Sequence, residues 1–186
     1  DEFVERVVQR ARRAKLGDPF DTATDQGPQV SDEQMRKILG YISLGKEQGA
    51  SLLTGGAQFG SQGYWVEPTI FGDVRDDMAI AREEIFGPVM SIMKYSDYDE
   101  VIRRANASEY GLAAGVWTTS IDLANTLSRA LRVGTVWINT YNQFDAAAPF
   151  GGYKQSGIGR DKGEYALQQY TETKLVQMPL HKPAWK

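Results

Sequence analysis

The sequence has no cysteine and only one histidine, and these scarcities remove several kinds of active site. Without cysteine, these residues form no disulfide, hold no thiolate-bound metal and supply no thiol nucleophile. A Ser-His-Asp triad would have to use His181, which sits near Pro179 and Pro183 in a tail without periodic pattern. We therefore expect no nucleophile, no catalytic residue and no metal ligand set in this chain.

Long apolar runs and a strong net charge are also missing. No hydrophobic stretch approaches the roughly 20 residues that a membrane-spanning helix needs. The net charge of -3 gives no basic surface for nucleic acid or an anionic membrane. With 41% hydrophobic and 24% charged residues, the composition is that of an ordinary globular domain. We expect a soluble protein, with the cytoplasm favoured, although a targeting sequence could be missing.

The first residues already form a helical pattern. In "DEFVERVVQRARRAKLGDP" one apolar stripe follows helical spacing, and Gly17 and Pro19 then end the helix. The residues of this stripe are Phe3, Val4, Val7, Val8 and Ala11. A chain that opens inside an amphipathic helix, without Met, is expected to be a piece of a longer protein.

Strands and helices alternate along the rest of the chain. Ser31 begins a helix with Gln34 as its capping-box partner, and Ser96 and Ser120 are expected to cap two later helices. "DDMAIAREE" and "GEYALQQY" complete the predicted helices. The predicted strands are "ASLLTGG", "GYWVEPTIF", "VMSIMKY", "GLAAGVWT", "GTVWIN" and "TETKLVQM". Pro68 marks the second strand as an edge or bulged strand, and the apolar "GTVWIN" suits burial on both faces.

This alternation predicts a single α/β unit with a mostly parallel sheet and helices on both faces. The last strand is an exception, because no helix follows it to return the chain to the sheet. Residues 140–160, "TYNQFDAAAPFGGYKQSGIGR", form a long irregular loop after a buried strand, where α/β proteins bind ligands. The spacing of "GIGRDKG" favours tight turns over a dinucleotide fingerprint. Phe144 and Phe150 in this loop fit either core plugs or pocket walls.

The stretch "EEIFGPV", residues 83–89, places two carboxylates and a phenyl ring just before a Gly-Pro stop. Glu84 at a helix C-terminus would oppose the helix macrodipole. One interpretation is a frayed helix end with one buried ring. The other is a carboxylate that accepts hydrogen bonds from a ribose diol, beside a ring that packs on a flat heterocycle. The residues alone leave both open.

Six segments in order resemble the C-terminal part of the catalytic domain of NAD(P)-dependent aldehyde dehydrogenases. They are "GDPFDTATDQGPQVS", "GYWVEPTIF", "EEIFGPV", "YGLAAGVWT", "GTVWINTY" and "PFGGYKQSGIGRDKGEYAL". The resemblance runs from residue 1 to about residue 178. It implies an incomplete α/β fold of that type, with residues 1–170 from the catalytic domain and 171–186 as oligomerisation strand and tail.

The resemblance also implies roles for particular residues. Glu84 would bind the nicotinamide ribose, Phe86 would pack on the nicotinamide, and Gln34 would approach a cofactor ribose. The aldehyde tunnel would be lined by Phe144 and Phe150, with Asn142 and Gln143 in the loop that selects the substrate. The last strand would join a partner subunit through Glu172, Lys174, Leu175 and Val176, making the protein a dimer or tetramer. Arg160 is the candidate partner for Glu172.

The largest departure from that family is what the chain lacks. The family's cysteine nucleophile, glutamate base and cofactor domain all lie upstream of the matching region, as do the residues that distinguish NAD from NADP. The resemblance thus implies a fragment of an enzyme that oxidises an aldehyde to a carboxylic acid through a cysteine thioester, inactive alone. The alternative is a truncated, non-catalytic module that associates with full-length subunits through its last strand.

Overall fold

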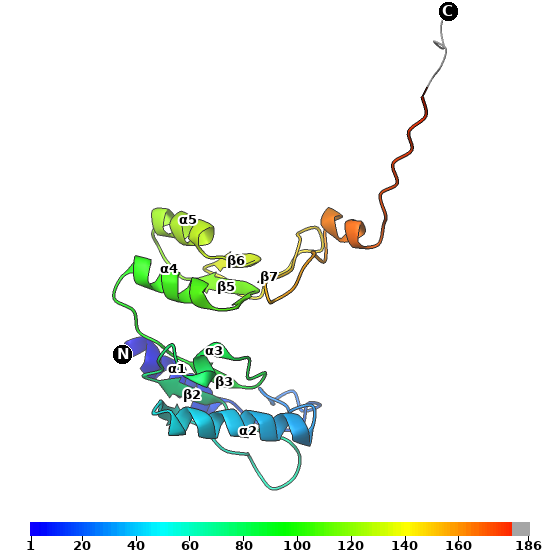
Figure 1. The fold of residues 1–186 in the computed structure, drawn as a ribbon. Coiled ribbons are helices and arrows are strands. Elements are labelled where there is room, and N and C mark those ends of the chain that lie inside the picture. Colours follow the sequence, from blue (N-terminus) through cyan, green and yellow to red (C-terminus); the bar gives the residue numbers. More distant parts are fainter. Residues whose placement is uncertain (180–186) are drawn as a thin grey trace, which may run out of the picture. The chain divides into compact units, whose positions relative to one another are not determined.

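The computed structural model describes residues 1–179, and the chain divides into two compact units (Figure 1). The first unit is Asp1–Ser96 and the second begins at Asp97. The α/β class expected from the sequence is confirmed, but the strands form short separate sheets instead of one sheet in one unit. Alternating strands and helices give the fold class, but they do not say which strands are hydrogen-bonded neighbours.

The first unit places three helices around a small mixed sheet. Its elements are α1 (Glu2–Arg13), α2 (Asp32–Glu47), β1 (Ser51–Thr54), β2 (Thr69–Gly72), α3 (Ala79–Arg82) and β3 (Val89–Ser91). The strand order is β1-β2-β3, antiparallel between β1 and β2 and parallel between β2 and β3. Of the two predicted alternatives for "GYWVEPTIF", the edge position is wrong, because β2 is central and buried throughout. The pairing of β2 with β1 does contain an irregularity, since its register shifts between Leu52 and Thr54. Pro68 precedes β2 and so removes no hydrogen bond from the sheet.

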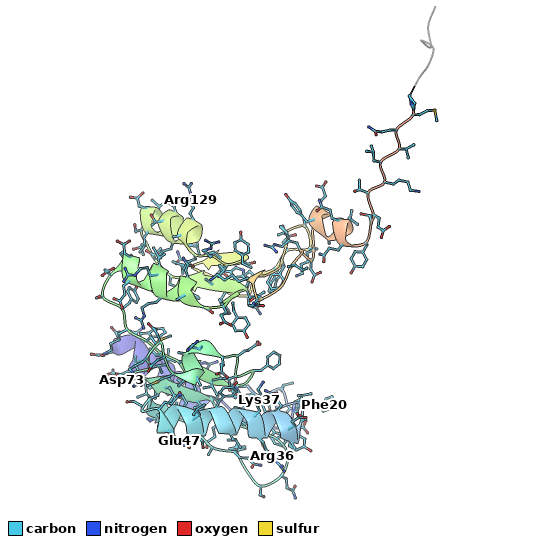
Figure 2. All side chains as sticks on the ribbon, viewed as in Figure 1. Phe20, Arg36, Lys37, Glu47, Asp73 and Arg129 are labelled. Atoms are coloured by element: carbon cyan, nitrogen blue, oxygen red, sulfur yellow. The ribbon has the colours of Figure 1, made fainter. Side chains whose placement is uncertain are left out.

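α2 provides one wall of the core. Its stripe of Met35, Ile38 and Ile42 packs with Phe71 of β2 and Ile80 of α3. In Figure 2, Arg36 and Lys37 mark the N-terminal half of this helix and Glu47 marks its last turn. α3 has only four residues instead of the predicted two turns, because residues 75–78 before it form a turn closed by the Met78 N–H to the Arg75 carbonyl at 3.2 Å.

The second unit sets two helices beside paired strands (Figure 1). Its elements are α4 (Tyr98–Ala107), β4 (Tyr110–Gly111), β5 (Ala113–Val116), α5 (Ile121–Ala130), β6 (Thr135–Ile138), β7 (Tyr153–Lys154) and the 3-10 helix η1 (Glu164–Gln169). β5 and β6 are parallel, and β4 and β7 are antiparallel.

Two expectations for the second unit are corrected. Asp97, not Ser96, caps α4 by accepting from the Glu100 N–H at 2.8 Å, whereas Ser120 caps α5 as predicted. β6 is not buried on both faces: Trp137 is buried but Ile138 is 39% exposed. The reason is that the sheet around β6 is only two strands wide within residues 1–179.

The C-terminal segment is exposed and irregular. Residues 171–179, which include the whole predicted strand "TETKLVQM", belong to no helix or strand. A strand exists only through hydrogen bonds to a neighbouring strand, and an alternating pattern does not supply one. Pairing of this segment with another subunit therefore stays a prediction, and His181 lies outside the described residues. Among residues 1–179 no helix has the length and apolar character needed to cross a membrane.

Candidate functional site

Residues 83–88, the clamp segment, leave the end of α3 in an extended conformation. The Glu83 N–H still bonds the Ala79 carbonyl at 2.9 Å, but the Glu83 backbone has φ -108° and ψ 151°. Glu84 thus lies beyond the helix and not at its C-terminus, so the expected conflict with the macrodipole is small. Its side chain is exposed.

The next two residues, Ile85 and Phe86, differ sharply in burial. Ile85 is 8% exposed and belongs to the core. Phe86 is 71% exposed, and its backbone has φ +57°, in the left-handed region. That region costs a non-glycine residue about 1–2 kcal/mol, so the surrounding structure must hold it there. A large apolar ring is therefore kept in solvent on a strained backbone.

Gln34 supplies part of that support. Its Nε2 donates to the Phe86 carbonyl at 2.9 Å and to the Ile85 carbonyl at 3.2 Å. Because both partners are acceptors, the amide atom facing them must be nitrogen, and both of its hydrogens are used. The Ser31 hydroxyl caps α2 by accepting from the Gln34 N–H at 3.2 Å, but the predicted capping box is only half formed. Oε1 of Gln34 takes no part in these bonds.

Gly87 and Pro88 fix the other end of the segment. A Cβ at Gly87 would lie 2.4 Å from Cδ1 of Ile38, a fully buried residue of α2, so only glycine permits this approach. The Pro88 carbonyl accepts from the Thr69 N–H at 2.8 Å, and β3 begins at the next residue. The backbone is therefore not a frayed helix end: α2 and β2 hold it while Glu84 and Phe86 face solvent.

An aromatic cluster in the second unit joins β6 and the end of β5 to the loop after β6. Its rings come from Trp117, Trp137, Tyr141, Phe144 and Phe150. Phe144 meets Phe150 edge to face at 5.0 Å and Trp137 at 5.6 Å between ring centroids. The buried Trp137 also donates its indole N–H to the Gln143 carbonyl at 2.8 Å. This bond fixes the loop directly before Phe144.

The two predicted tunnel residues differ in exposure. Phe150 is half-buried, and its N–H and carbonyl pair with Asp161 at 2.8 and 2.7 Å. Phe144 is 48% exposed, and Nζ of Lys162 lies 4.3 Å from its ring centroid. Asn142, with φ +57°, and Gln143 are both exposed in the same loop. The cluster is thus packed on one side and open at Phe144, which fits a wall better than a core plug.

Three residues of these sites were missed from the sequence. Tyr41 donates its hydroxyl to Oε2 of Glu83 at 2.8 Å, and it lies seven residues after Gln34, a helical spacing that could have indicated it. Trp137 was assigned only to a buried strand. Lys162 carries no local signal, because its contact with Phe144 depends on how the loop folds.

The residues of the predicted oligomerisation strand are also placed. Leu175 and Val176 are 78% and 75% exposed, and Glu172 and Lys174 are exposed as well. Arg160 donates from Nη1 to the Gly152 carbonyl at 3.0 Å and lies over the Tyr153 ring. The apolar side chains of the segment are thus available for burial by another chain.

Comparisons with known proteins agree on one family. Residues 1–176 match the aldehyde dehydrogenase family. The chain is 59% identical over 185 residues to the mitochondrial benzaldehyde dehydrogenase of Antirrhinum majus, covering 100% of this chain and 35% of that protein. It is 59% identical over 176 residues to human mitochondrial aldehyde dehydrogenase, covering 95% of this chain and 34% of that protein.

Solved structures give the same result. The NAD+ complex of Bacillus cereus aldehyde dehydrogenase superposes with a TM-score of 0.89 at 52% identity, covering 91% of this chain and 34% of that one. An indole-3-acetaldehyde dehydrogenase complexed with NAD+ gives a TM-score of 0.91 at 47% identity, covering 94% of this chain and 36% of that one. The chain spans about a third of the length of these relatives. It belongs to the aldehyde dehydrogenase family.

Proposed function

We propose that this chain is the C-terminal part of the catalytic domain of an NAD(P)-dependent enzyme that oxidises an aldehyde to a carboxylic acid through a cysteine thioester. The observation that carries the proposal is the clamp segment, which fixes its backbone while exposing Glu84 and Phe86. Relatives that were solved in complex with NAD+ support a dinucleotide as the ligand.

The exposed groups suit the two halves of a nicotinamide riboside. A carboxylate such as Glu84 accepts hydrogen bonds from both hydroxyls of a ribose diol. The Phe86 ring offers a flat apolar face to a heterocycle. Oε1 of Gln34 would accept a hydrogen bond from a further ribose hydroxyl, since the side-chain N–H groups of Gln34 already donate to the Ile85 and Phe86 carbonyls. When bound, the dinucleotide supplies the hydride acceptor, and these residues orient it.

The aromatic cluster would form part of the aldehyde pocket. Phe144 and Phe150 would line it, and the exposed side chains of Asn142 and Gln143 would help to select the aldehyde. The thiol nucleophile must come from elsewhere in the protein, because this chain has no cysteine. Residues 1–186 would therefore supply the cofactor clamp and a pocket wall but not the covalent chemistry.

The test is Glu84→Gln in the full-length enzyme that contains this chain. A hydrogen bond to a charged group contributes about 1.5–3 kcal/mol. We therefore expect single-turnover formation of NADH or NADPH to slow by about tenfold or more, with a smaller change in dinucleotide affinity. Glu47→Gln, at an exposed carboxylate in the last turn of α2, is the control and should behave as wild type. An unchanged rate for Glu84→Gln would show that Glu84 is a surface carboxylate with no part in cofactor binding.

The isolated chain should not oxidise aldehydes. Loss of the nucleophile removes most of the rate in covalent catalysis. Purified 1–186, incubated with acetaldehyde or benzaldehyde and NAD or NADP, should form no reduced cofactor. Turnover that tracks the purified chain and not a contaminant would contradict the proposal.

The second candidate function is a non-catalytic module that joins full-length subunits through its last strand. The exposure of Leu175, Val176 and Met178 favours it, since exposed apolar segments recruit partners. The distinguishing measurement is co-purification of tagged 1–186 with full-length subunits expressed in the same cell. Oligomers that contain both 1–186 and full-length subunits support the non-catalytic module. Separate purification of 1–186 and the full-length subunits supports the proposal that the chain is only a part of the enzyme.

A further inference from the structure

We infer that Tyr41 is a positioning residue for hydride transfer, acting on the clamp segment through Glu83. The inference rests on the proposed function, because it assigns Tyr41 a role in orienting Glu84. The Tyr41 hydroxyl donates to Oε2 of Glu83 at 2.8 Å, across a sequence separation of 42 residues. Glu83 directly precedes Glu84, so this bond fixes the chain at the point where it enters the clamp.

The bond is one of three contacts from a single face of α2. Gln34, Ile38 and Tyr41 follow the spacing i, i+4, i+7, which places their side chains on one stripe. Gln34 donates to the carbonyls of residues 85 and 86, and Ile38 packs where Gly87 passes closest. Tyr41 binds Glu83. The three contacts therefore reach the segment on both sides of Glu84.

Tyr41 also distinguishes two adjacent carboxylates. Glu83 has extended backbone angles, so its side chain and that of Glu84 point to opposite sides of the segment. Glu83 accepts from Tyr41, which leaves Glu84 as the carboxylate that faces a ligand. Without the phenol hydroxyl, the hold on the N-terminal side of Glu84 would be the bond from the Glu83 N–H to the Ala79 carbonyl of α3, a helix of four residues whose ends fray. Glu84 would then be fixed from the Ile85 side alone, and its side chain would sample more directions.

The test is Tyr41→Phe in the full-length enzyme, measured beside Glu84→Gln. We expect single-turnover NADH formation to slow about fivefold, by partial loss of a charge-assisted hydrogen bond. The dinucleotide dissociation constant and the thermal midpoint should match those of Tyr64→Phe, the control at an exposed tyrosine of the same unit. In a Glu83→Ala background, Tyr41→Phe should have no further effect, because the two residues act as a pair.

The outcomes separate the two levels of inference. Slowing by both Tyr41→Phe and Glu84→Gln, without a thermal shift, supports the role of Tyr41. Slowing by Glu84→Gln alone overturns it and leaves the clamp proposal standing. No effect of either variant overturns both. A thermal midpoint that falls in proportion to the rate, or an additive effect with Glu83→Ala, assigns Tyr41 to general stability and overturns the inference.

Discussion

Replacement of Gln34 by Glu or Ala separates support of the clamp backbone from direct contact with a ligand. The side-chain amide donates two hydrogen bonds, to the Ile85 and Phe86 carbonyls. Two neutral hydrogen bonds contribute about 1–3 kcal/mol together. The left-handed conformation of Phe86 costs about 1–2 kcal/mol. The bonds and the strain are thus of similar size, so loss of the bonds should let Phe86 return to an ordinary φ and move its ring.

Which of the two substitutions reduces function more shows which role Gln34 has. Gln34→Ala removes both donors. Gln34→Glu keeps the size and one acceptor but turns an oxygen toward the Ile85 and Phe86 carbonyls, which repel it. If Gln34 acts by supporting the backbone, Glu should be worse than Ala. If it acts only by accepting a ligand hydroxyl through Oε1, Glu should retain function.

The assay is single-turnover NADH formation in the full-length enzyme, with hydrogen exchange over residues 83–89. We expect about tenfold slower hydride transfer for Gln34→Ala, a larger loss for Gln34→Glu, and faster exchange in both. Gln26→Ala is the matched control, since its Nε2 donates to the Val66 carbonyl at 2.7 Å in the same unit. It should lower stability without changing exchange over 83–89. A wild-type rate for Gln34→Glu beside a slow Gln34→Ala would refute the backbone role.

Two further predictions concern the close approach at Gly87 and the last segment. Gly87→Ala should lower the free energy of unfolding by about 1–3 kcal/mol in urea titrations, because its methyl group overlaps the buried Ile38. Adding Ile38→Ala should then cost less than Ile38→Ala alone, and simple additivity would argue against this contact. Leu175→Pro should dissociate the parent dimer or tetramer in light scattering, because proline removes a strand donor. A wild-type oligomer for that variant would place the segment within its own subunit.

Local patterns were sufficient for the family and for the positions of the helices, but not for the length of α3 or the 3-10 form of η1. The helix predicted to begin at Ser31 is present as α2, because its apolar residues three and four apart share a helix face whatever surrounds them. The Ser120 cap is correct because its partner, Leu123, is three residues away. At α4 two neighbouring residues suit a cap, and the choice of Asp97 over Ser96 depends on how the chain enters the helix. "EEIFGPV" and the glycine-rich loop carried the family resemblance, which the comparisons confirm.

The tertiary structure decided the contacts that join distant residues. Gln34 reaches carbonyls 51 and 52 positions away, and Tyr41 reaches Glu83 over 42, so local spacing could place both residues on one helix face but could not name their partners. The central position of β2 could not be read from its own residues, because a strand's place depends on its neighbours. The sequence by itself determined that Glu84 and Phe86 stand before a rigid stop. Only the fold showed them held toward solvent, because the supporting donors and the Ile38 contact come from another element.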